Sequence, residues 1–401
     1  MKILMLVPFL PIDQMSGGQT RWFHLIKHLS EKHEITLMSL IKDDWERKYL
    51  PQIEKYCKKV YVFKRPKSPW TFRNLFLTLI SFNPLVVIRN LSLEERSAIK
   101  KELSTHKYDL IHAETFYVMP HIPKTKIPII LVEPTIEYSV YKHYVNNEVS
   151  PILKPIYMFD VVKLKFWEKF YWHRATKLFA VSEDDKKLIQ SEEPKLDVGV
   201  ISNGVDLEFF DSKKVIKKDP PRILYHGNYK WMQNVEAVNL LVREIWPRIK
   251  NEIKDVKLWI SGRNVPPEII EYSKLDIDIE ISESVEDNRD VYKASALLVT
   301  PIRGPGGTRL KVLEAMASGL PVVSTPVGVA GLGITAGKEA LVSSNMDKLS
   351  EMVIDLLKNK DKAERIGKAG REFVKINFDW RGIVAKLNKV YDETKTKRNN
   401  S

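Results

Sequence analysis

Residues 301–325 read P-I-R-G-P-G-G-T-R-L-K-V-L-E-A-M-A-S-G-L-P-V-V-S-T. A glycine-rich turn leads into a helical pattern that ends at Gly319, and a β-branched strand follows. Glycines at the start of a helix let backbone N–H groups approach a ligand closely, and the helix N-terminus favours an anion there. The stretch therefore predicts an α/β unit with an anion-binding turn.

Two cations strengthen this interpretation. Arg309 and Lys311 lie on the first turn of the predicted helix, where the helix dipole disfavours positive charge. A bound diphosphate would explain them, whereas an ordinary turn with a solvated basic end is the alternative. Glu314, further along the helix, suits the paired hydroxyls of a ribose. The turn residues expected around the anion are Gly306, Gly307 and Thr308.

Strand-like and amphipathic helical runs alternate along the whole chain, which is typical of parallel α/β sheets. A chain of 401 residues exceeds one ordinary core. A Lys-rich run and a Pro-Pro pair in 206–221 suggest a linker. We expect an α/β protein of two Rossmann-like, doubly wound domains, 1–205 and 206–378. The expected strands are 3–7, 35–40, 60–63, 110–113, 127–132, 178–181, 198–201, 223–226, 257–261, 277–281, 297–300, 322–324 and 340–342.

The composition is that of a soluble globular protein, with 44% hydrophobic and 29% charged residues. The single Cys57 excludes an intrachain disulfide framework. The apolar run 3–10 is broken by Pro8 and leads into a glycine turn, so we interpret it as a buried strand and not as a signal peptide. No run reaches the length of a membrane-spanning helix. We expect a cytoplasmic protein.

Positive charge is concentrated in residues 55–107, which contain 12 basic and 3 acidic residues. Aromatic residues such as Trp70, Phe72 and Phe76 are interleaved with them. This pattern suits an anionic bilayer or a phosphorylated lipid acceptor. A solvated basic face over an ordinary core remains the alternative, and no nucleic-acid-binding motif accompanies the charge.

Further stretches accompany residues 301–325 in a recognisable order. They are S-G-G-Q-T-R-W-F-H-L-I-K-H-L (16–29), A-V-S-E-D-D (180–185), I-S-N-G-V-D-L-E-F-F (201–210), H-G-N-Y-K-W-M-Q-N-V-E-A-V (226–238), S-G-R-N-V-P-P (261–267) and V-E-D (285–287). Together the chain resembles the retaining, nucleotide-sugar-dependent glycosyltransferases of the GT-B fold (group 1, family 4). That family includes bacterial polysaccharide and lipid-linked mannosyl and glucosyl transferases. The resemblance implies an acceptor domain, a donor domain, a cleft between them, and a C-terminal helix (379–396) that packs on the first domain.

The resemblance also implies a set of donor-binding residues. Outside the 301–325 stretch these are Gly17, Gly18, Arg21, Gly227, Lys230, Arg263 and Val285. The chain departs from the family at two places. The first Glu of the family signature falls at Gly306, and the Arg and Lys that the family supplies to the diphosphate are both replaced, the Lys position reading Gln233-Asn234. Lys311, Arg309 and Lys230 are the expected substitutes.

Catalytic candidates lie in the first domain. His112 and Glu114 match the segment where relatives carry a His near the anomeric centre, and Glu133 and Glu137 match a second acidic segment. These carboxylates could orient hydroxyls or act as a base; local capping or ion pairing is the alternative. The pair Asp276 and Asp278 has metal-binding spacing but lies in a predicted strand, so no metal is expected.

The sequence thus predicts a retaining, metal-independent hexosyltransferase without a cofactor. Its expected partners are a nucleotide-diphosphate sugar, a glycan or lipid-linked acceptor, and an anionic membrane surface contacted through 55–107, with no nucleic acid. Its expected location is the cytoplasm or the inner membrane face. Epimerase or hydrolase chemistry, or a non-catalytic assembly subunit that keeps the nucleotide-sugar pocket, are the alternatives.

Overall fold

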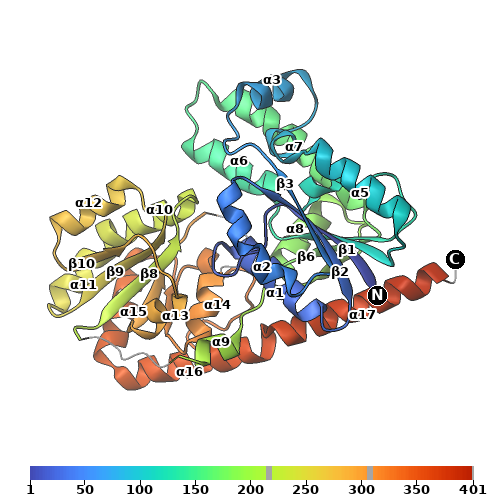
Figure 1. The fold of residues 1–401 in the computed structure, drawn as a ribbon. Helices are drawn as coiled ribbons and strands as arrows, with labels where there is room; N and C mark the ends of the chain where they lie inside the picture. Colours follow the sequence, from blue (N-terminus) through green and yellow to red (C-terminus); the bar gives the residue numbers. More distant parts are fainter. Residues whose placement is uncertain (214–218, 305–309, 400–401) are drawn as a thin grey trace. The chain divides into compact units, whose positions relative to one another are not determined.

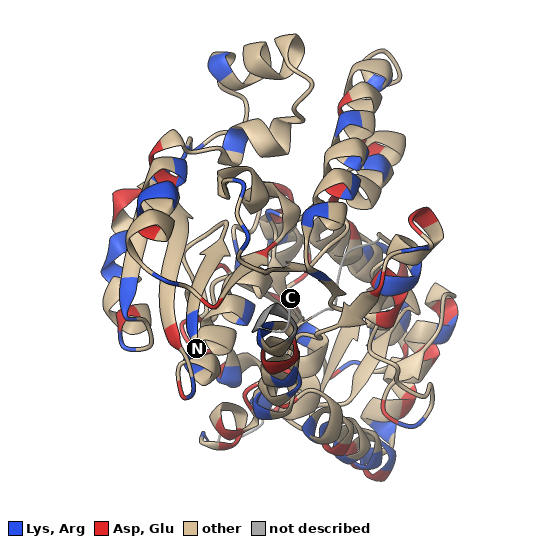
Figure 2. Cartoon of the chain, turned by 90° about the vertical axis from the view of Figure 1, so that its right-hand side faces the viewer, with Lys and Arg blue, Asp and Glu red and all other residues tan. Residues whose placement is uncertain are grey.

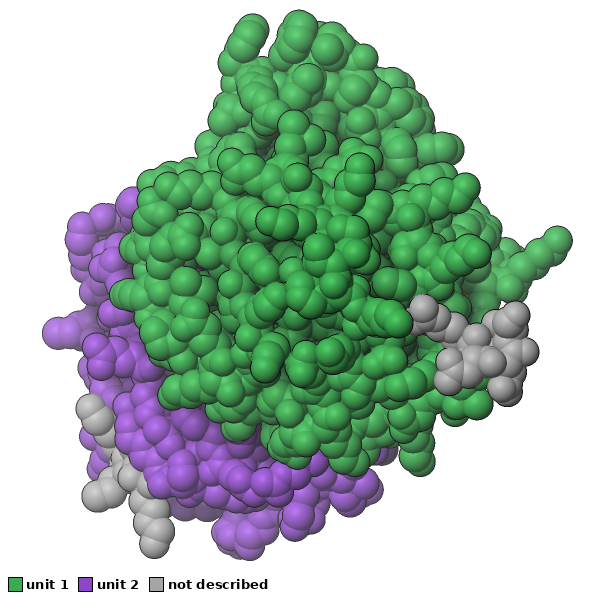
Figure 3. Space-filling view, turned by 45° about the vertical axis from the view of Figure 1, so that its right-hand side comes forward, with its two compact units in different colours: residues 1–202, 305–307, 383–401 green, residues 203–304, 308–382 purple. Residues whose placement is uncertain are grey.

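The structure is a computed structural model that describes residues 1–213, 219–304 and 310–399, with side chains as far as 396. The described chain divides into two compact units (Figure 3). Unit 1 contains 1–202 and the chain from Ile383 onward; unit 2 contains 203–304 and 310–382. The domain boundary expected from the sequence, between 205 and 206, lies close to the change of unit between Ser202 and Asn203.

Unit 1 is built on a parallel sheet, which among the described residues has seven strands in the order β3-β2-β1-β4-β5-β6-β7 (Figure 1). The strands are β1 (Lys2–Val7), β2 (Glu34–Ile41), β3 (Lys59–Lys64), β4 (Leu110–Glu114), β5 (Ile129–Glu133), β6 (Lys177–Ala180) and β7 (Val198–Val200). β1 pairs with β2 on one side and with β4 on the other. The strand order therefore reverses between β1 and β4, and ligands of such sheets bind beyond the carboxyl ends of the strands at that point.

The helices of unit 1 follow its strands in βα order. They are α1 (Gly17–Leu29), η1 (Asp44–Tyr49), α2 (Leu50–Glu54), α3 (Phe72–Ile80), α4 (Leu85–Asn90), α5 (Leu93–Thr105), η2 (Phe116–His121), α6 (Glu137–Glu148), α7 (Lys154–Arg174), α8 (Glu183–Glu192) and the part of α17 (Trp380–Asn399) that begins at Ile383. Strands β1, β4 and β5 are buried along nearly their whole length, because apolar residues cover both faces of a parallel sheet.

Unit 2 repeats the same topology with six parallel strands among its described residues, in the order β10-β9-β8-β11-β12-β13. The strands are β8 (Arg222–Asn228), β9 (Lys257–Arg263), β10 (Ile279–Ser282), β11 (Leu297–Thr300), β12 (Val322–Ser324) and β13 (Leu341–Val342). The helices are α9 (Leu207–Asp211), α10 (Met232–Leu240), η3 (Leu241–Ile245), α11 (Trp246–Glu252), α12 (Pro267–Leu275), α13 (Asn288–Lys293), α14 (Leu310–Ala317), η4 (Val327–Val329), α15 (Met346–Lys358) and α16 (Lys360–Asn377). Here the order reverses between β8 and β11.

The predicted fold class is confirmed: both units are Rossmann-like parallel α/β domains, and each expected strand overlaps an observed one. Two details differ. The predicted strand 277–281 begins only at Ile279. Asp276 is the C-cap of α12, and its side chain accepts a hydrogen bond from the backbone N–H of Asp278, so these residues form a turn. Residues 234–250 have the apolar spacing of one helix, but a π-helical turn at Leu241–Ile245 interrupts it, one residue before Pro247. Proline removes a backbone donor from the helical ladder, which accounts for a break there.

Candidate functional site

Unit 2 gathers polar residues beyond the carboxyl ends of β8 and β9, beside the point where the strand order reverses. His226 and Gly227 are near the end of β8, and Ser261, Gly262 and Arg263 are at the same level of β9. The register pairs Gly227 with Gly262. Because all strands of this sheet are parallel, these residues lie at the edge where ligands of doubly wound sheets bind.

Lys311, on the first turn of α14, reaches into this cluster. Its Nζ donates to Asn234 Oδ1 at 2.8 Å and to the hydroxyl of Tyr225 at 3.2 Å. The ammonium lies 4.3 Å from the centre of the Tyr225 ring, within cation–π range. Asn234 is held in turn, because its Nδ2 donates to the carbonyl of Asn228 at 2.7 Å. These contacts therefore hold the Lys311 ammonium in place near the carboxyl end of β8.

Two glycines make room for this arrangement. A Cβ on Gly227 would lie 2.9 Å from Lys311 Nζ and 3.2 Å from Asn234 Cγ, so a side chain there would displace the ammonium. A Cβ on Gly262 would lie 1.7 Å from the Gly227 carbonyl oxygen, and Gly262 has a φ of +143° that other residues rarely adopt. Glycine at 262 therefore allows the two strands to approach closely, and glycine at 227 leaves room for the Lys311 ammonium.

His226 is kept neutral inside this cluster. Burial, followed by the nearby charges of Lys311 and Arg263, lowers the pKa of His226 to about 3. Its Nδ1 lies 2.8 Å from the hydroxyl of Ser261. The local positive charge thus comes from the lysine and the arginine, while the imidazole acts as an uncharged hydrogen-bonding group.

Glu314 lies one turn beyond Lys311 on α14 and is partly exposed. Its Oε2 accepts a hydrogen bond from the hydroxyl of Tyr292 at 2.7 Å. The Tyr292 ring contacts His226 edge-on, with 5.6 Å between the ring centres. Tyr292 therefore connects the predicted ribose-binding carboxylate to the basic cluster, and sequence reasoning did not single it out.

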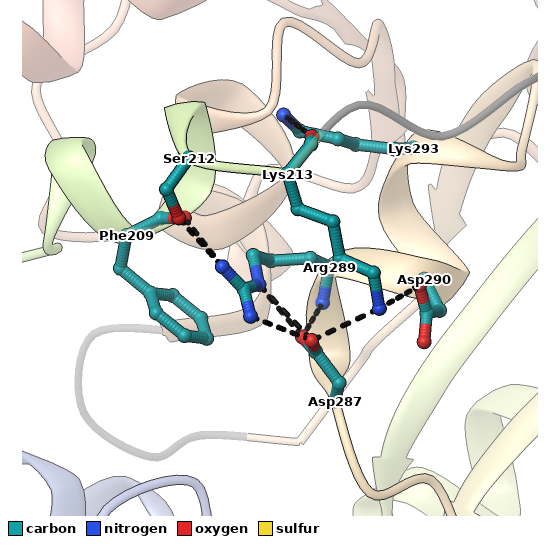
Figure 4. A network of polar contacts seen from close by, with 7 residues as sticks. All are labelled: Phe209, Ser212, Lys213, Asp287, Arg289, Asp290 and Lys293. Atoms are coloured by element: carbon teal, nitrogen blue, oxygen red, sulfur yellow. Dashed lines mark hydrogen bonds and ion pairs between the residues drawn. The ribbon is translucent and has the colours of Figure 1, made fainter.

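A charged network fixes the helix that carries Tyr292 (Figure 4). Asp287 caps α13 through the backbone N–H of Arg289 and pairs with the Arg289 guanidinium at 2.8 Å and with Lys213 at 3.1 Å. Although burial alone would raise the pKa of Asp287, these partners lower it to about 2. Arg289 also stacks on the Phe209 ring at 4.1 Å. The network anchors α13 to the segment that follows α9.

The other donor-binding candidates of unit 2 have different positions. Lys230 is exposed on the turn after β8. Val285 is partly buried and packs against the hydrophobic core. Four further candidates lie outside the described residues: Gly306, Gly307, Thr308 and Arg309. Within the described part, the structure thus brings Gly227, Arg263, Lys311 and Glu314 to the same edge of the sheet, with Lys230 on the adjoining turn.

The residues that sequence reasoning missed in unit 2 are Tyr225, Asn234, His226, Tyr292 and Gly262. One signal was available. Asn234 stands in the segment where relatives carry a lysine, and the structure shows that it holds a lysine from elsewhere in the chain. The others depend on strand register and helix packing, which the sequence pattern does not specify.

In unit 1 the predicted residues Arg21, His112 and Glu114 form one buried network. The Arg21 Nε donates to Glu114 Oε2 at 3.2 Å, and its Nη1 donates to the Ser202 carbonyl at 2.9 Å. His112 Nε2 lies 3.0 Å from Glu114 Oε1, and its Nδ1 lies 2.5 Å from the Tyr391 hydroxyl. Burial alone would raise the pKa of Glu114, but Arg21 and His112 outweigh it and hold that pKa below its ordinary value.

This network joins α1, β4 and the C-terminal helix α17. Arg21 is 1% exposed, and His112 and Glu114 are fully buried, so these side chains satisfy one another away from solvent. The geometry indicates that these side chains hold α1, β4 and α17 in position. The donor contact predicted for Arg21 and the catalytic roles predicted for His112 and Glu114 stay predictions.

Glu137, the third catalytic candidate, has a different environment. It begins α6, is partly exposed, and burial raises its pKa to about 7. Glu168 accepts hydrogen bonds from the backbone N–H groups of Glu137 and Tyr138 at 2.9 and 3.0 Å. Glu133 is fully buried and accepts from the Trp172 indole at 3.2 Å. Of the acidic residues predicted here, Glu137 alone combines partial exposure with a pKa near neutrality, as a base requires.

Two further predictions concern the first helix and the acidic pair. Gly17 and Gly18 form the first turn of α1, after a backbone-extended Ser16, and Gly17 is exposed. Asp276 accepts a hydrogen bond from the Trp246 indole at 2.7 Å, and Asp278 pairs with Lys250 and with Lys257. Both acids thus have structural partners at the start of β10.

Comparison with known proteins agrees with this architecture. The family model described as Glycosyltransferase Family 4 matches residues 15–209, and the model described as Glycosyl transferases group 1 matches residues 220–359. The chain is 22% identical over 397 residues to an uncharacterized 44.6 kDa protein in the cps region of Klebsiella pneumoniae. That alignment covers 96% of this chain and 98% of the relative.

Solved structures show the same fold. The sucrose-phosphate synthase of Thermosynechococcus elongatus superposes with a TM-score of 0.71 at 16% identity, over 98% of both chains. Anabaena Alr3699/HepE, crystallised with UDP-glucose, superposes with a TM-score of 0.62 at 14% identity, over 98% of this chain and 99% of that one. With both halves matched by glycosyltransferase models on two Rossmann-like domains, the chain belongs to the GT-B glycosyltransferases of group 1 and family 4.

Proposed function

We propose that this glycosyltransferase transfers a hexose from a nucleotide-diphosphate sugar, that unit 2 binds the donor, and that the reaction retains the anomeric configuration without a metal. The observation that carries the proposal is the fixed ammonium of Lys311 over Gly227 at the edge where the strand order reverses. A nucleoside diphosphate leaves with negative charge, and a preorganised cation stabilises that charge as it develops.

The neighbouring residues suit the other parts of such a donor. Arg263, at the end of β9 and paired in register with Asn228, would supply a second cation. The partly exposed Glu314 suits two ribose hydroxyls. In transfer, the bond from the anomeric carbon to the diphosphate oxygen breaks and a bond to an acceptor hydroxyl oxygen forms, while that hydroxyl loses its proton. The Anabaena structure with UDP-glucose supports a nucleotide-sugar donor.

A donor screen tests this assignment. Thermal unfolding is measured with UDP-, GDP- and ADP-sugars, because a ligand at about 100 times its Kd stabilises the folded protein by about 2.7 kcal/mol. The stabilising donor is then incubated with glycan and lipid-linked acceptors, and the anomeric configuration of the product is read by proton NMR. Transfer with retention is expected. Release of free sugar without transfer would favour hydrolase chemistry, an epimerised donor would favour an epimerase, and absence of both binding and turnover would refute the proposal.

We also propose that unit 1 contacts a membrane surface, and two stripes of exposed apolar residues in unit 1 support this. The stripe on α3 consists of Phe72 (85% exposed), Leu75, Phe76, Leu79 (81%) and Ile80. The stripe on and before α7 consists of Ile152 (86%), Ile156, Phe159, Val162, Phe166 and Phe170. Both sets follow the spacing that normally faces a core. We call them together the apolar surface; in Figure 2, α3 at the top of the view is drawn almost wholly tan.

The two helices that form the apolar surface are attached to one another. Lys163 of α7 donates to the Thr78 carbonyl at 2.7 Å, the Trp167 indole donates to the Phe82 carbonyl at 2.7 Å, and Trp70 contacts Tyr157. An apolar face that includes α3 of the basic window 55–107 suits an anionic bilayer. Among the described residues no helix has the length and apolar character to cross a membrane. We propose peripheral contact at the cytoplasmic face, where a lipid-linked acceptor would lie.

Liposome co-sedimentation tests the membrane contact. Wild type is expected to bind anionic vesicles at low salt. The double substitution Phe72→Ser with Phe159→Ser is expected to reduce the part of the binding that persists at high salt, because apolar contacts are not screened by salt. Ile277→Ser, at an 87% exposed residue of unit 2, is the matched control. Equal binding by all three proteins, or no binding by wild type, would contradict this contact.

A further inference from the structure

Two arginines of unit 1 have no acidic partner among the described residues. Arg65 directly follows β3 and is 6% exposed, and Arg89 lies near the end of α4 and is partly exposed. Arg65 Nη1 donates to Asn90 Oδ1 at 3.0 Å, which places its guanidinium at the same end of α4. The Nε atoms of both arginines are buried and make no hydrogen bond.

Such an arrangement is costly for a protein without a ligand. A buried guanidinium ordinarily has a carboxylate partner, because desolvation of the charge is otherwise uncompensated. Arg65 instead has the amide of Asn90 and the face of Phe9, whose ring centre is 4.2 Å from its guanidinium carbon. The nearby Glu46 is engaged by the backbone N–H groups of Lys42 and Asp43.

The electrostatics agree with this geometry. Burial, followed by the like charge of Arg89, lowers the pKa of Arg65 to about 10. Two cations that disfavour each other gain most from an anion that both can contact. Phosphate suits them, because each guanidinium offers several N–H donors in a plane that matches phosphate oxygens.

The pair has a defined relation to Glu137. Tyr117 lies within electrostatic range of both Glu137 and Arg65, and Tyr141 lies within range of both Glu137 and Arg89. Both tyrosines are therefore near the arginine pair and near Glu137, which we predict to be catalytic. All of these residues belong to unit 1 and follow its strands at their carboxyl ends or lie on helices beyond them.

We propose that Arg65 and Arg89 bind a phosphate group of the acceptor. This inference rests on the proposed function in that it treats unit 1 as the acceptor domain. The phosphate could belong to a soluble phosphorylated sugar or to a lipid-linked phosphate; both present the same oxygens to the two guanidinium groups.

The first test uses inorganic phosphate as the probe. Calorimetric titration is done on the full chain with the stabilising nucleoside diphosphate present at saturation, so that unit 2 does not contribute. Wild type is expected to bind phosphate, and Arg89→Gln is expected to weaken binding about tenfold or more. Arg96→Gln, on an exposed arginine of α5, is the matched control and is expected to bind within twofold of wild type. Arg89→Gln is the main variant because Arg89 is the more exposed of the two; Arg65→Lys, with its folding checked by circular dichroism, is the second.

The second test distinguishes the two sources. A hexose phosphate and a detergent-solubilised polyprenyl phosphate are titrated in parallel, and the tighter ligand identifies the acceptor class. Absence of phosphate binding by wild type, or equal binding by wild type and Arg89→Gln, would overturn the proposal. Nucleoside diphosphate binding is measured in separate titrations of the same proteins. Its loss with phosphate binding intact would count against the donor assignment and leave the arginine site standing.

Discussion

Displacing the Lys311 ammonium gives the sharpest test of the donor site, and two different substitutions do so. Lys311→Met removes the charge and keeps the aliphatic chain. Gly227→Ala places a methyl group 2.9 Å from Nζ and 3.2 Å from Asn234 Cγ, so that the ammonium must leave its position. Because Nζ is the end of a flexible side chain, this movement costs the fold little, while the hydrogen bonds to Asn234 and Tyr225 are lost.

The expected loss follows from the contact that the ammonium makes with a diphosphate. A hydrogen bond to a charged group contributes about 1.5–3 kcal/mol, which is about ten- to a hundredfold in Kd. Isothermal titration calorimetry of the nucleoside diphosphate against the bare nucleoside measures it. Both variants are expected to lose affinity for the diphosphate and to keep affinity for the nucleoside.

Two controls separate affinity from stability. Lys348→Met removes an exposed lysine of α15 and is expected to bind as wild type does. Gly262→Ala places a methyl group 1.7 Å from a backbone oxygen at a φ of +143°, so it is expected to lower the unfolding temperature, unlike Gly227→Ala. Diphosphate affinity unchanged in Lys311→Met, or nucleoside and diphosphate weakened equally, would refute the role of Lys311.

Further predictions concern other parts of the two units. Glu314→Gln is expected to lose the preference of the wild type for a ribonucleotide over its 2′-deoxy form, measured as a ratio of Kd values; a wild type without that preference would remove the ribose role. Glu137 has a raised pKa of about 7, so its carboxyl group destabilises the fold as pH rises through about 4.5 to 7. Glu137→Gln should therefore raise stability at pH 8, by at most about 3 kcal/mol, and change it little at pH 4.5, as chemical denaturation would show; an equal gain at both pH values would contradict the shift. Tyr391→Phe leaves a buried His112 nitrogen without its partner and is expected to cost about 1–3 kcal/mol in thermal unfolding, and an unchanged unfolding temperature would count against the network. Transferase activity is expected to survive EDTA, because cationic side chains supply the charge; abolition with rescue by Mg²⁺ or Mn²⁺ would reveal a metal site.

Local sequence patterns determined the two sheets. Short β-branched runs between amphipathic helices predicted the strands of both units. A strand of a parallel sheet is buried on both faces, so its own residues are apolar and the strand can be recognised from its local sequence. Lys311 and Glu314 were also predicted from local features, a cation and an acid spaced on one helix, whereas Gly227 was predicted from the resemblance. The resemblance to GT-B glycosyltransferases rested on the same stretches.

Tertiary structure decided which of these groups meet. Asn234 holds Lys311 although 77 residues separate them, and Tyr292 reaches Glu314 from another helix. Arg21, His112 and Glu114 are paired inside unit 1 with Tyr391, which lies 279 residues beyond His112. No periodicity encodes such contacts, because they depend on strand order and register. The same reason applies to Arg65 and Arg89: that neither has an acidic partner among the described residues is visible only when the neighbours of each side chain are in place.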